Sequence, residues 1–132
     1  EEALDAYGTN LGMAFQLVDD ALDYAADQQT LGKTVGDDMR EGKITLPVLA
    51  AYHAADAEGR AFWERVIEQG EQTDEDLPHA LERIAQTNAI RTTVECAQTY
   101  ADKAVQALSI FPDSPVRRLM VDAAAYTVSR AN

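Results

Sequence analysis

The stretch LDAYGTNLGMAFQLVDDALDY, residues 4–24, indicates the fold, because its apolar side chains recur at three- and four-residue steps. Those side chains are Leu4, Tyr7, Leu11, Phe15, Val18 and Leu22. Such spacing places them along one face of an α-helix. We therefore predict one long helix from residue 2 to about residue 28. Gly8 and Gly12 lie inside it, and each weakens it by about 1 kcal/mol relative to Ala.

The helical pattern continues through most of the chain. Further helices are expected at residues 44–53, 61–69, 75–85, 89–108 and 115–130. The segment DAEGR, residues 56–60, is expected to be a break. We expect Thr73 or Asp74 to cap the helix at 75–85, and Ser114 to cap the last helix. No strand-like alternation is sustained, so the predicted class is all-α, a helical bundle.

Composition limits the possible partners. The chain has 132 residues, enough for one domain, and 23 acidic against 11 basic residues give a net charge of -12. This charge disfavours nucleic acid and anionic membranes as partners and is compatible with divalent cations. No apolar run approaches the roughly 20 residues needed to cross a bilayer. The single cysteine, Cys96, excludes an internal disulfide and fits a reducing compartment, so we expect a cytoplasmic protein.

An acidic stripe runs along the first predicted helix. Its members, which share about a third of the helix circumference, are Gln16, Asp19, Asp20 and Asp23. Like charges four residues apart destabilise an isolated helix by roughly a few tenths of a kcal/mol. A hard cation such as Mg²⁺ would offset this repulsion, since it prefers oxygen ligands and is usually held by one or two carboxylates together with phosphates. A solvated acidic face is the alternative interpretation.

The expected loop at residues 28–43 carries two Gly-Lys pairs, which end in Lys33 and Lys43. A nucleotide-binding phosphate loop needs another glycine five residues before the glycine of the pair, and both pairs have aspartate there, so this class of site is disfavoured. The lysines can still bind phosphate as point charges. Asp37 and Asp38 would extend the metal site if the loop folds back, although an ordinary surface loop fits equally well.

Taken together, these two motifs resemble a known family. FQLVDDALDY and GDDMREGKITLP, residues 15–24 and 36–47, are similar to the second aspartate-rich motif and the following lysine loop of trans-type polyprenyl diphosphate synthases. Bacterial octaprenyl and decaprenyl synthases look most similar, and ADKAVQAL and FPDSPVRRLMVDAA resemble their C-terminal half. The resemblance covers essentially the whole chain. It implies the all-α isoprenoid synthase fold, with residues 1–132 as the C-terminal part of one synthase domain.

The resemblance implies a metal site. Asp19, Asp20 and Asp23 match the family's DDxxD motif, which binds Mg²⁺ that bridges to the diphosphate of the allylic substrate. Asp38 matches a loop aspartate that reaches the metal through water. Asp19 and Asp20, with Lys33, are thereby expected to be catalytic.

The resemblance also implies a diphosphate site. Lys33 and Lys43 match the lysines that hold the allylic diphosphate, and Gln16 matches a glutamine beside the aspartates. Phe15 matches the phenylalanine of the family's FQ pair, whose expected role is to shape the hydrocarbon cavity.

The family chemistry accounts for this mixture of residues. An allylic diphosphate ionises to a carbocation and pyrophosphate, while Mg²⁺ and lysines stabilise the charge on the leaving group. The double bond of isopentenyl diphosphate attacks the cation, and a proton is lost. The implied product is a long-chain polyprenyl diphosphate of the quinone side-chain type. No protein nucleophile is needed, and we interpret Cys96, His53 and His79 as structural.

The family has features that this sequence does not contain. They include an earlier DDxxD motif and upstream basic residues for isopentenyl diphosphate. We therefore expect these 132 residues to be part of a longer enzyme, a homodimer by family, and to be inactive by themselves. We also expect exposed apolar surface, such as the face with Leu11, Phe15 and Leu22, and self-association.

Three other interpretations remain open. One is a non-catalytic helical subunit of a prenyl synthase, which the intact aspartate motif disfavours. Another is a terpene cyclase, which the lysine loop disfavours. The third is an acidic helical interaction domain without a ligand.

Overall fold

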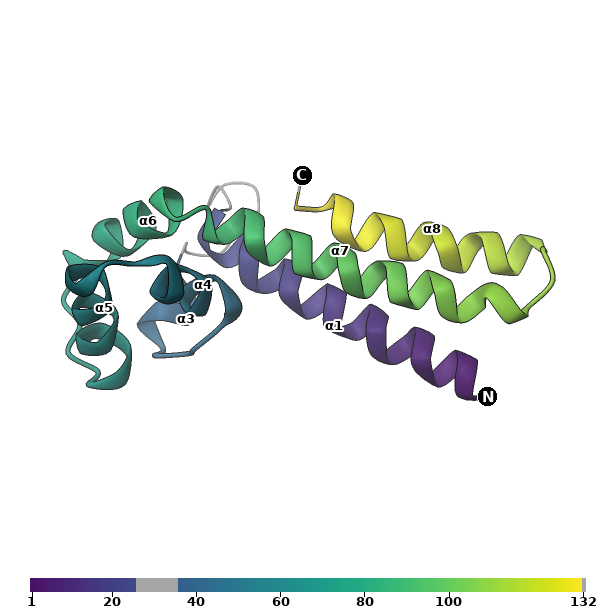
Figure 1. Cartoon of the computed structure of the whole chain (residues 1–132), viewed down its shortest axis with the longest axis horizontal. Helices are drawn as coiled ribbons and strands as arrows, with labels where there is room; N and C mark the ends of the chain where they lie inside the picture. The colour runs from purple at the N-terminus through teal and green to yellow at the C-terminus, as the bar shows by residue number, and fades with distance from the viewer. Residues whose placement is uncertain (26–35, 132) are drawn as a thin grey trace. The chain divides into compact units, whose positions relative to one another are not determined.

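The computed structural model describes residues 1–25 and 36–131 (Figure 1). All regular secondary structure in these residues is helical, which confirms the all-α prediction. The contacts divide the chain into two compact units. The first unit contains Glu1–Asp19 and the chain from Val94 onward, and the second contains the described residues between Asp20 and Thr93.

The first unit is built from three helices that run alongside one another (Figure 1). They are α1 (Glu2–Ala25) up to Asp19, α7 (Ala89–Ala107) from Val94, and α8 (Pro115–Ser129). The core contains Tyr7, Ala104 and Leu108, and the Tyr7 hydroxyl donates a hydrogen bond of 2.8 Å to the Met120 carbonyl oxygen. This bond joins α1 to α8.

The last helix begins as the sequence predicted. Ser114 has extended backbone, and its Oγ accepts a hydrogen bond of 3.1 Å from the Arg117 amide. Pro115 occupies the first helical position, where its missing N–H removes no hydrogen bond from the helix. The turn before α8 follows a short 3₁₀ helix, Leu108–Ile110.

The second unit gathers short helices around one apolar core. They are α3 (Asp37–Arg40), α4 (Leu46–Ala54), α5 (Ala57–Trp63), the π-helix Glu64–Glu68 that continues it, and α6 (Asp76–Gln86). The side chains of Trp63, Met39 and Val66 are almost completely buried. They pack in one cluster with Tyr24 and Val48, so the end of α1 is part of this core.

The predicted break at residues 56–60 was wrong, because α5 already begins at Ala57. The physical reason is the side chain of Asp56, whose Oδ1 accepts a hydrogen bond of 2.8 Å from the Gly59 amide and caps the helix. Gly59 also fits here because it has no side chain: a Cβ would lie 2.8 Å from that of Ala55 and 3.1 Å from an Arg83 nitrogen. A glycine that suggests a turn in sequence thus allows a close helix contact.

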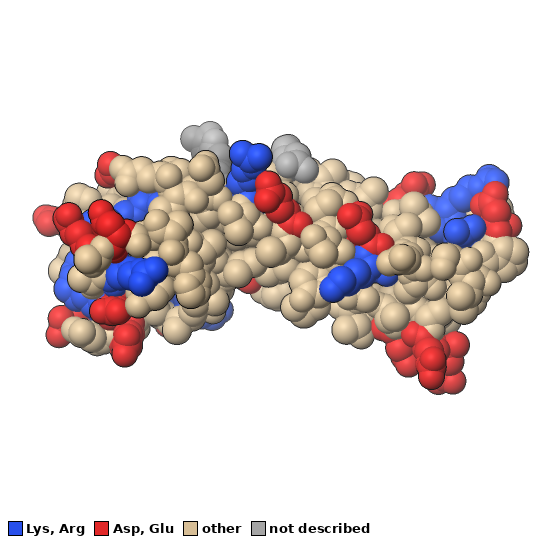
Figure 2. Space-filling view, in the orientation of Figure 1, with Lys and Arg blue, Asp and Glu red and all other residues tan. Residues whose placement is uncertain are grey.

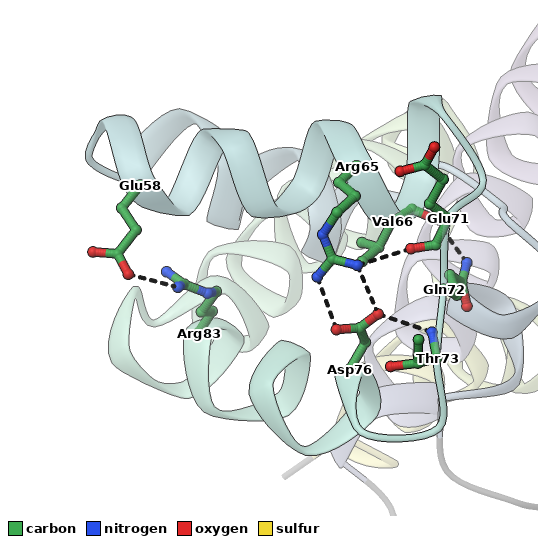
Figure 3. A network of polar contacts seen from close by, with 8 residues as sticks. All are labelled: Glu58, Arg65, Val66, Glu71, Gln72, Thr73, Asp76 and Arg83. Atoms are coloured by element: carbon green, nitrogen blue, oxygen red, sulfur yellow. Dashed lines mark hydrogen bonds and ion pairs between the residues drawn. The ribbon is translucent and has the colours of Figure 1, made fainter.

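The start of α6 also differs from the prediction, since neither Thr73 nor Asp74 provides its cap. Instead the buried Asp76 carboxylate accepts a hydrogen bond of 2.9 Å from the Thr73 amide. It also forms an ion pair with Arg65 through two hydrogen bonds, of 2.8 and 3.0 Å (Figure 3). Arg65 also donates to the Glu71 carbonyl oxygen at 2.9 Å. These bonds join the π-helix to α6 and hold the chain between them.

The surface carries charges of both signs. On the face drawn in Figure 2, lysine and arginine side chains lie among the more numerous acidic ones. Within residues 1–25 and 36–131, no helix is both long and apolar enough to cross a membrane.

Candidate functional site

The aspartates at the end of α1 are buried rather than solvated. Asp20 and Asp23 are 9% and 1% exposed. The Asp23 Oδ2 accepts a hydrogen bond of 3.0 Å from the Asp38 amide, and its backbone carbonyl accepts one of 2.8 Å from the Gly36 amide. A buried carboxylate needs such compensation. The loop therefore does return to the aspartate stripe, as the sequence suggested.

Gly36 makes that return possible. Its φ of 82° lies in the left-handed region, which glycine adopts without steric cost. A Cβ on Gly36 would also overlap the Leu77 side chain. The four-residue helix α3 follows directly, and its first turn carries Asp37 and Asp38.

Lys43 lies beside the same group of carboxylates. Its amide donates to the Asp38 carbonyl oxygen at 2.9 Å, and its Nζ lies 2.9 Å from Glu41 Oε2 and 3.8 Å from Asp38 Oδ1. The hydrogen bond to Glu41, helped by its charge and that of Asp38, raises the pKa of Lys43. Lys43 is therefore a fully charged, exposed cation at the edge of the aspartate cluster.

The remaining predicted site residues lie either in the first unit or outside the described residues. Gln16 is exposed, Asp19 is half-buried, and Phe15 is 51% exposed, and all three lie on α1 in the first unit. The Arg130 guanidinium lies 4.6 Å from the centre of the Phe15 ring. Lys33 lies outside the described residues.

The expected exposed face with Leu11, Phe15 and Leu22 is only partly correct. Phe15 is exposed, but Leu11 is half-buried and packs against the Tyr7 core, and Leu22 is also half-buried. Packing within the chain thus covers two of the three side chains.

Sequence reasoning missed two buried hydroxyl groups in the second unit, those of Tyr24 and Thr45. Tyr24 is 6% exposed, and its hydroxyl has no hydrogen-bond partner among the described residues, as is true of the buried Thr45 Oγ1. Burial, and then the charges of Asp23 and Asp38, raise the pKa of Tyr24 well above its usual range. Tyr24 could have been flagged because it directly follows the DDxxD motif, whereas Thr45 resembled an ordinary helix cap.

The carboxylate oxygens at this site fit a hard cation whose coordination is completed by oxygen atoms of a bound ligand. No three His, Cys, Asp or Glu side chains in residues 1–25 and 36–131 form a preformed metal cage. Mg²⁺ seldom uses such a cage: it keeps waters and takes one or two carboxylates together with phosphate oxygens. Asp20, Asp23 and Asp38 supply oxygen donors of that kind, and Lys43 supplies a charge for phosphate.

The interpretation of His53, His79 and Cys96 as structural stays a prediction. Both histidines are exposed, and Cys96 is a half-buried free thiol on α7.

Comparisons with known proteins show which family this chain is similar to. The family model described as polyprenyl synthetase matches residues 1–84. The octaprenyl diphosphate synthase of Escherichia coli (strain K12) is 43% identical over 130 residues, which are 98% of this chain and 40% of that enzyme.

Among solved structures, polyprenyl synthases are also similar to this chain. A polyprenyl synthase from Caulobacter crescentus CB15, complexed with calcium and isoprenyl diphosphate, superposes with a TM-score of 0.91 and 48% identity over 99% of this chain and 40% of its own. A decaprenyl diphosphate synthase from Rhodobacter capsulatus has a TM-score of 0.85 and 44% identity over 99% of this chain and 39% of its own. The chain thus spans about 40% of the length of these relatives.

Proposed function

The chain belongs to the polyprenyl synthetase family, and from that premise we propose that it carries half of the active site of a trans-prenyltransferase. The whole enzyme would add isopentenyl diphosphate units to an allylic diphosphate and make a long-chain polyprenyl diphosphate of the quinone side-chain type. The observation that carries the proposal is the return of the loop: Asp38 and Lys43 lie against the buried aspartate end of α1.

In the proposed reaction the carbon–oxygen bond of the allylic diphosphate breaks, and pyrophosphate leaves with the electron pair. The double bond of isopentenyl diphosphate then attacks the allylic cation, a carbon–carbon bond forms, and a proton is lost. The enzyme's main task is to stabilise the negative charge that develops on the departing pyrophosphate.

The residues of the second unit suit that task. Asp20 and Asp23 would hold the metal, and Asp38 would contact it through water. Mg²⁺, when bound, supplies positive charge that offsets the charge on the phosphate oxygens. Lys43 would bind the same oxygens as a point charge, at the cost of its ion pair with Glu41.

The other assignments rest on the family motif. Asp19 would complete the metal ligands, Gln16 and Lys33 would bind the diphosphate, and Phe15 would line the hydrocarbon cavity. The calcium and isoprenyl diphosphate in the Caulobacter complex support a divalent ion and a diphosphate here, and Mg²⁺ is the specific proposal. A homodimer and a cytoplasmic location are parts of the same proposal.

The proposal can be tested on the 132-residue chain by calorimetric titration with inorganic pyrophosphate in Mg²⁺. We expect binding that EDTA abolishes, because the carboxylates contact pyrophosphate through the metal. Lys43→Ala should weaken binding by roughly tenfold or more, the value of one charge-assisted contact. Lys103→Ala is the matched control, since Lys103 is an exposed lysine on α7 in the first unit.

Two results would contradict the proposal. One is the absence of Mg²⁺-dependent binding to a chain whose circular dichroism shows that it is folded. The other is an equal loss of affinity in the Lys43 and Lys103 variants, which would indicate non-specific attraction.

A further inference from the structure

The side chain of Gln72 bridges two helices of the second unit, and the proposed function assigns it no role. Its Nε2 donates a hydrogen bond of 2.6 Å to the Met39 carbonyl oxygen in α3. The same nitrogen donates one of 2.9 Å to the Val66 carbonyl oxygen in the π-helix (Figure 3). A side-chain amide nitrogen carries two hydrogens, so this arrangement uses both. Because both partners are acceptors, only the nitrogen end of the amide fits between them.

The backbone on both sides of Gln72 is itself held in place. The Glu71 amide donates to the Arg65 carbonyl oxygen at 3.0 Å, and the Glu71 carbonyl oxygen accepts a hydrogen bond of 2.9 Å from the Arg65 guanidinium. The Thr73 amide donates to the buried Asp76 carboxylate at 2.9 Å. Since Arg65 and Asp76 also pair with each other, Gln72 extends from a segment that is bonded at both of its neighbours (Figure 3).

The Met39 carbonyl belongs to the turn that carries two of the proposed site residues. Met39 directly follows Asp38 in α3, and its carbonyl oxygen also accepts a hydrogen bond of 2.9 Å from the Gly42 amide. The next hydrogen bond of the same turn joins the Lys43 amide to the Asp38 carbonyl oxygen, also at 2.9 Å. Gln72 is therefore bonded to the middle of the turn that connects Asp38 with Lys43.

The hydrogen bond supplies a direction that apolar packing does not. The Met39 side chain is 1% exposed and packs in the core of the second unit, but the hydrophobic effect is non-directional. The turn also brings Asp38 to the buried Asp23, whose Oδ2 accepts the Asp38 amide at 3.0 Å, and like charges oppose this approach. A directed bond from Gln72 offsets part of that repulsion by holding the turn in one orientation.

We propose that Gln72 is a positioning residue that keeps Asp38 and Lys43 against the aspartate end of α1. In this proposal Gln72 touches neither metal nor substrate and acts through the Met39 carbonyl. The inference rests on the proposed function for its consequence in binding, but its effect on the turn can be measured without any ligand.

The first test is amide hydrogen exchange in the 132-residue chain, followed by NMR. The reporters are the amides of Gly42 and Lys43, which donate within the turn. Gln72→Leu removes both side-chain donors at similar size and should speed the exchange of both amides by roughly three- to tenfold, the value of one net hydrogen bond. Gln72→Glu keeps the shape but sets carboxylate oxygens against two carbonyl oxygens, so it should speed exchange at least as much. If one of these variants fails to fold, the other decides the question.

Two comparisons separate local positioning from a general loss of stability. The reference amide is that of Gly59, which donates to Asp56 at the start of α5 in the same unit, and its exchange should not change. Gln86→Leu, the matched control, removes an exposed glutamine side chain from α6 and should leave the Gly42 and Lys43 amides unchanged. Unchanged exchange of these two amides in a folded Gln72 variant, or an equal acceleration at Gly59, would overturn the proposal.

The second test measures the affinity for inorganic pyrophosphate in Mg²⁺ by calorimetric titration. Gln72→Leu should weaken binding by roughly three- to tenfold, whereas Gln86→Leu should bind like wild type. The double variant Gln72→Leu/Lys43→Ala should lose less than the product of the two single losses, because Gln72 acts partly through Lys43. A residue that only stabilises the fold would show no such coupling.

The outcomes distinguish the two proposals. If wild type itself does not bind pyrophosphate, the proposed function fails, while hydrogen exchange still decides whether Gln72 holds the turn. If wild type and the leucine variant bind equally, the positioning role is refuted and the proposed function stands. Losses that multiply fully in the double variant would also refute the positioning role.

Discussion

At the scale of single residues, Gly36 has the clearest structural requirement near the site. Its amide donates to the Asp23 carbonyl, its φ is 82°, and the Leu77 side chain occupies the space that a Cβ would need. Gly42 shares the positive φ, at 73°, but has open space around its missing Cβ. A substitution at Gly42 therefore introduces only backbone strain, whereas the same substitution at Gly36 adds steric overlap to it.

We predict that Gly36→Ala lowers the free energy of unfolding by about 2–4 kcal/mol, because left-handed strain and overpacking add together. Gly42→Ala, the matched control, should cost only about 1–2 kcal/mol from the backbone. Urea denaturation followed by circular dichroism measures both values. Equal losses in the two variants would show that Leu77 yields without cost.

The residues of the site were partly predictable from sequence. Helical spacing placed Asp20 and Asp23 together, and the glycines allowed a loop that brings Asp38 and Lys43 back to them. The burial of the Tyr24 hydroxyl and of Thr45 Oγ1 was not predictable, because it depends on how side chains from different elements pack. Sequence spacing within one helix carries no such information.

At the scale of elements, the Arg65–Asp76 ion pair fixes how the π-helix meets α6 (Figure 3). Hydrogen bonds from Arg65 and from the Thr73 amide lower the pKa of Asp76 to about 2, from its usual 3.8. Because the folded-state pKa lies below the unfolded one, the pair contributes stability above about pH 4 and loses it as the pH falls towards 2.

We predict that Asp76→Asn lowers the free energy of unfolding by about 1–2 kcal/mol at pH 7, and that its difference from wild type shrinks as the pH falls from about 4 to about 2. Thermal unfolding between pH 2 and pH 7 measures this. Asp113→Asn is the control: Arg118 also lowers the pKa of Asp113, but that pair is exposed and screened by solvent, so its loss should change stability much less than the loss of the Asp76 pair. A pH-independent difference at Asp76 would refute the prediction.

The elements themselves were predicted more reliably than their ends. Apolar periodicity located every long helix, and Ser114 caps α8 as expected. The start of α5 was missed because residues 56–60 were expected to be a break, whereas Asp56 caps the helix and Gly59 permits close packing. The π-helix Glu64–Glu68 was also missed, because residues 61–69 were expected to form one ordinary α-helix.

At the scale of the whole molecule, α8 carries an apolar stripe on its solvent side. Val116, Leu119 and Tyr126 are 68%, 69% and 68% exposed, and their spacing places them on one face of the helix. On α1, Leu4, Met13 and Phe15 are also exposed by 43% or more. Exposed apolar area of this kind favours association.

We predict that the isolated chain self-associates in a concentration-dependent manner, as measured by sedimentation velocity. Leu119→Lys should raise the apparent dissociation constant by about tenfold or more, because burying an unpaired charge opposes association. Ala125→Lys adds the same charge at an exposed position of α8 outside the stripe and serves as the control. A monodisperse monomer at high concentration would contradict the prediction.

The buried tryptophan gives this small molecule a built-in optical probe. Trp63 is the only tryptophan of the chain, is 2% exposed, and packs edge-to-face against Phe62 in the core of the second unit. Its fluorescence thus reports the integrity of that core, whereas the far-ultraviolet dichroism sums helices of both units. Coincident unfolding curves from the two signals would indicate one cooperative transition, and a gap between them would measure how independently the units melt.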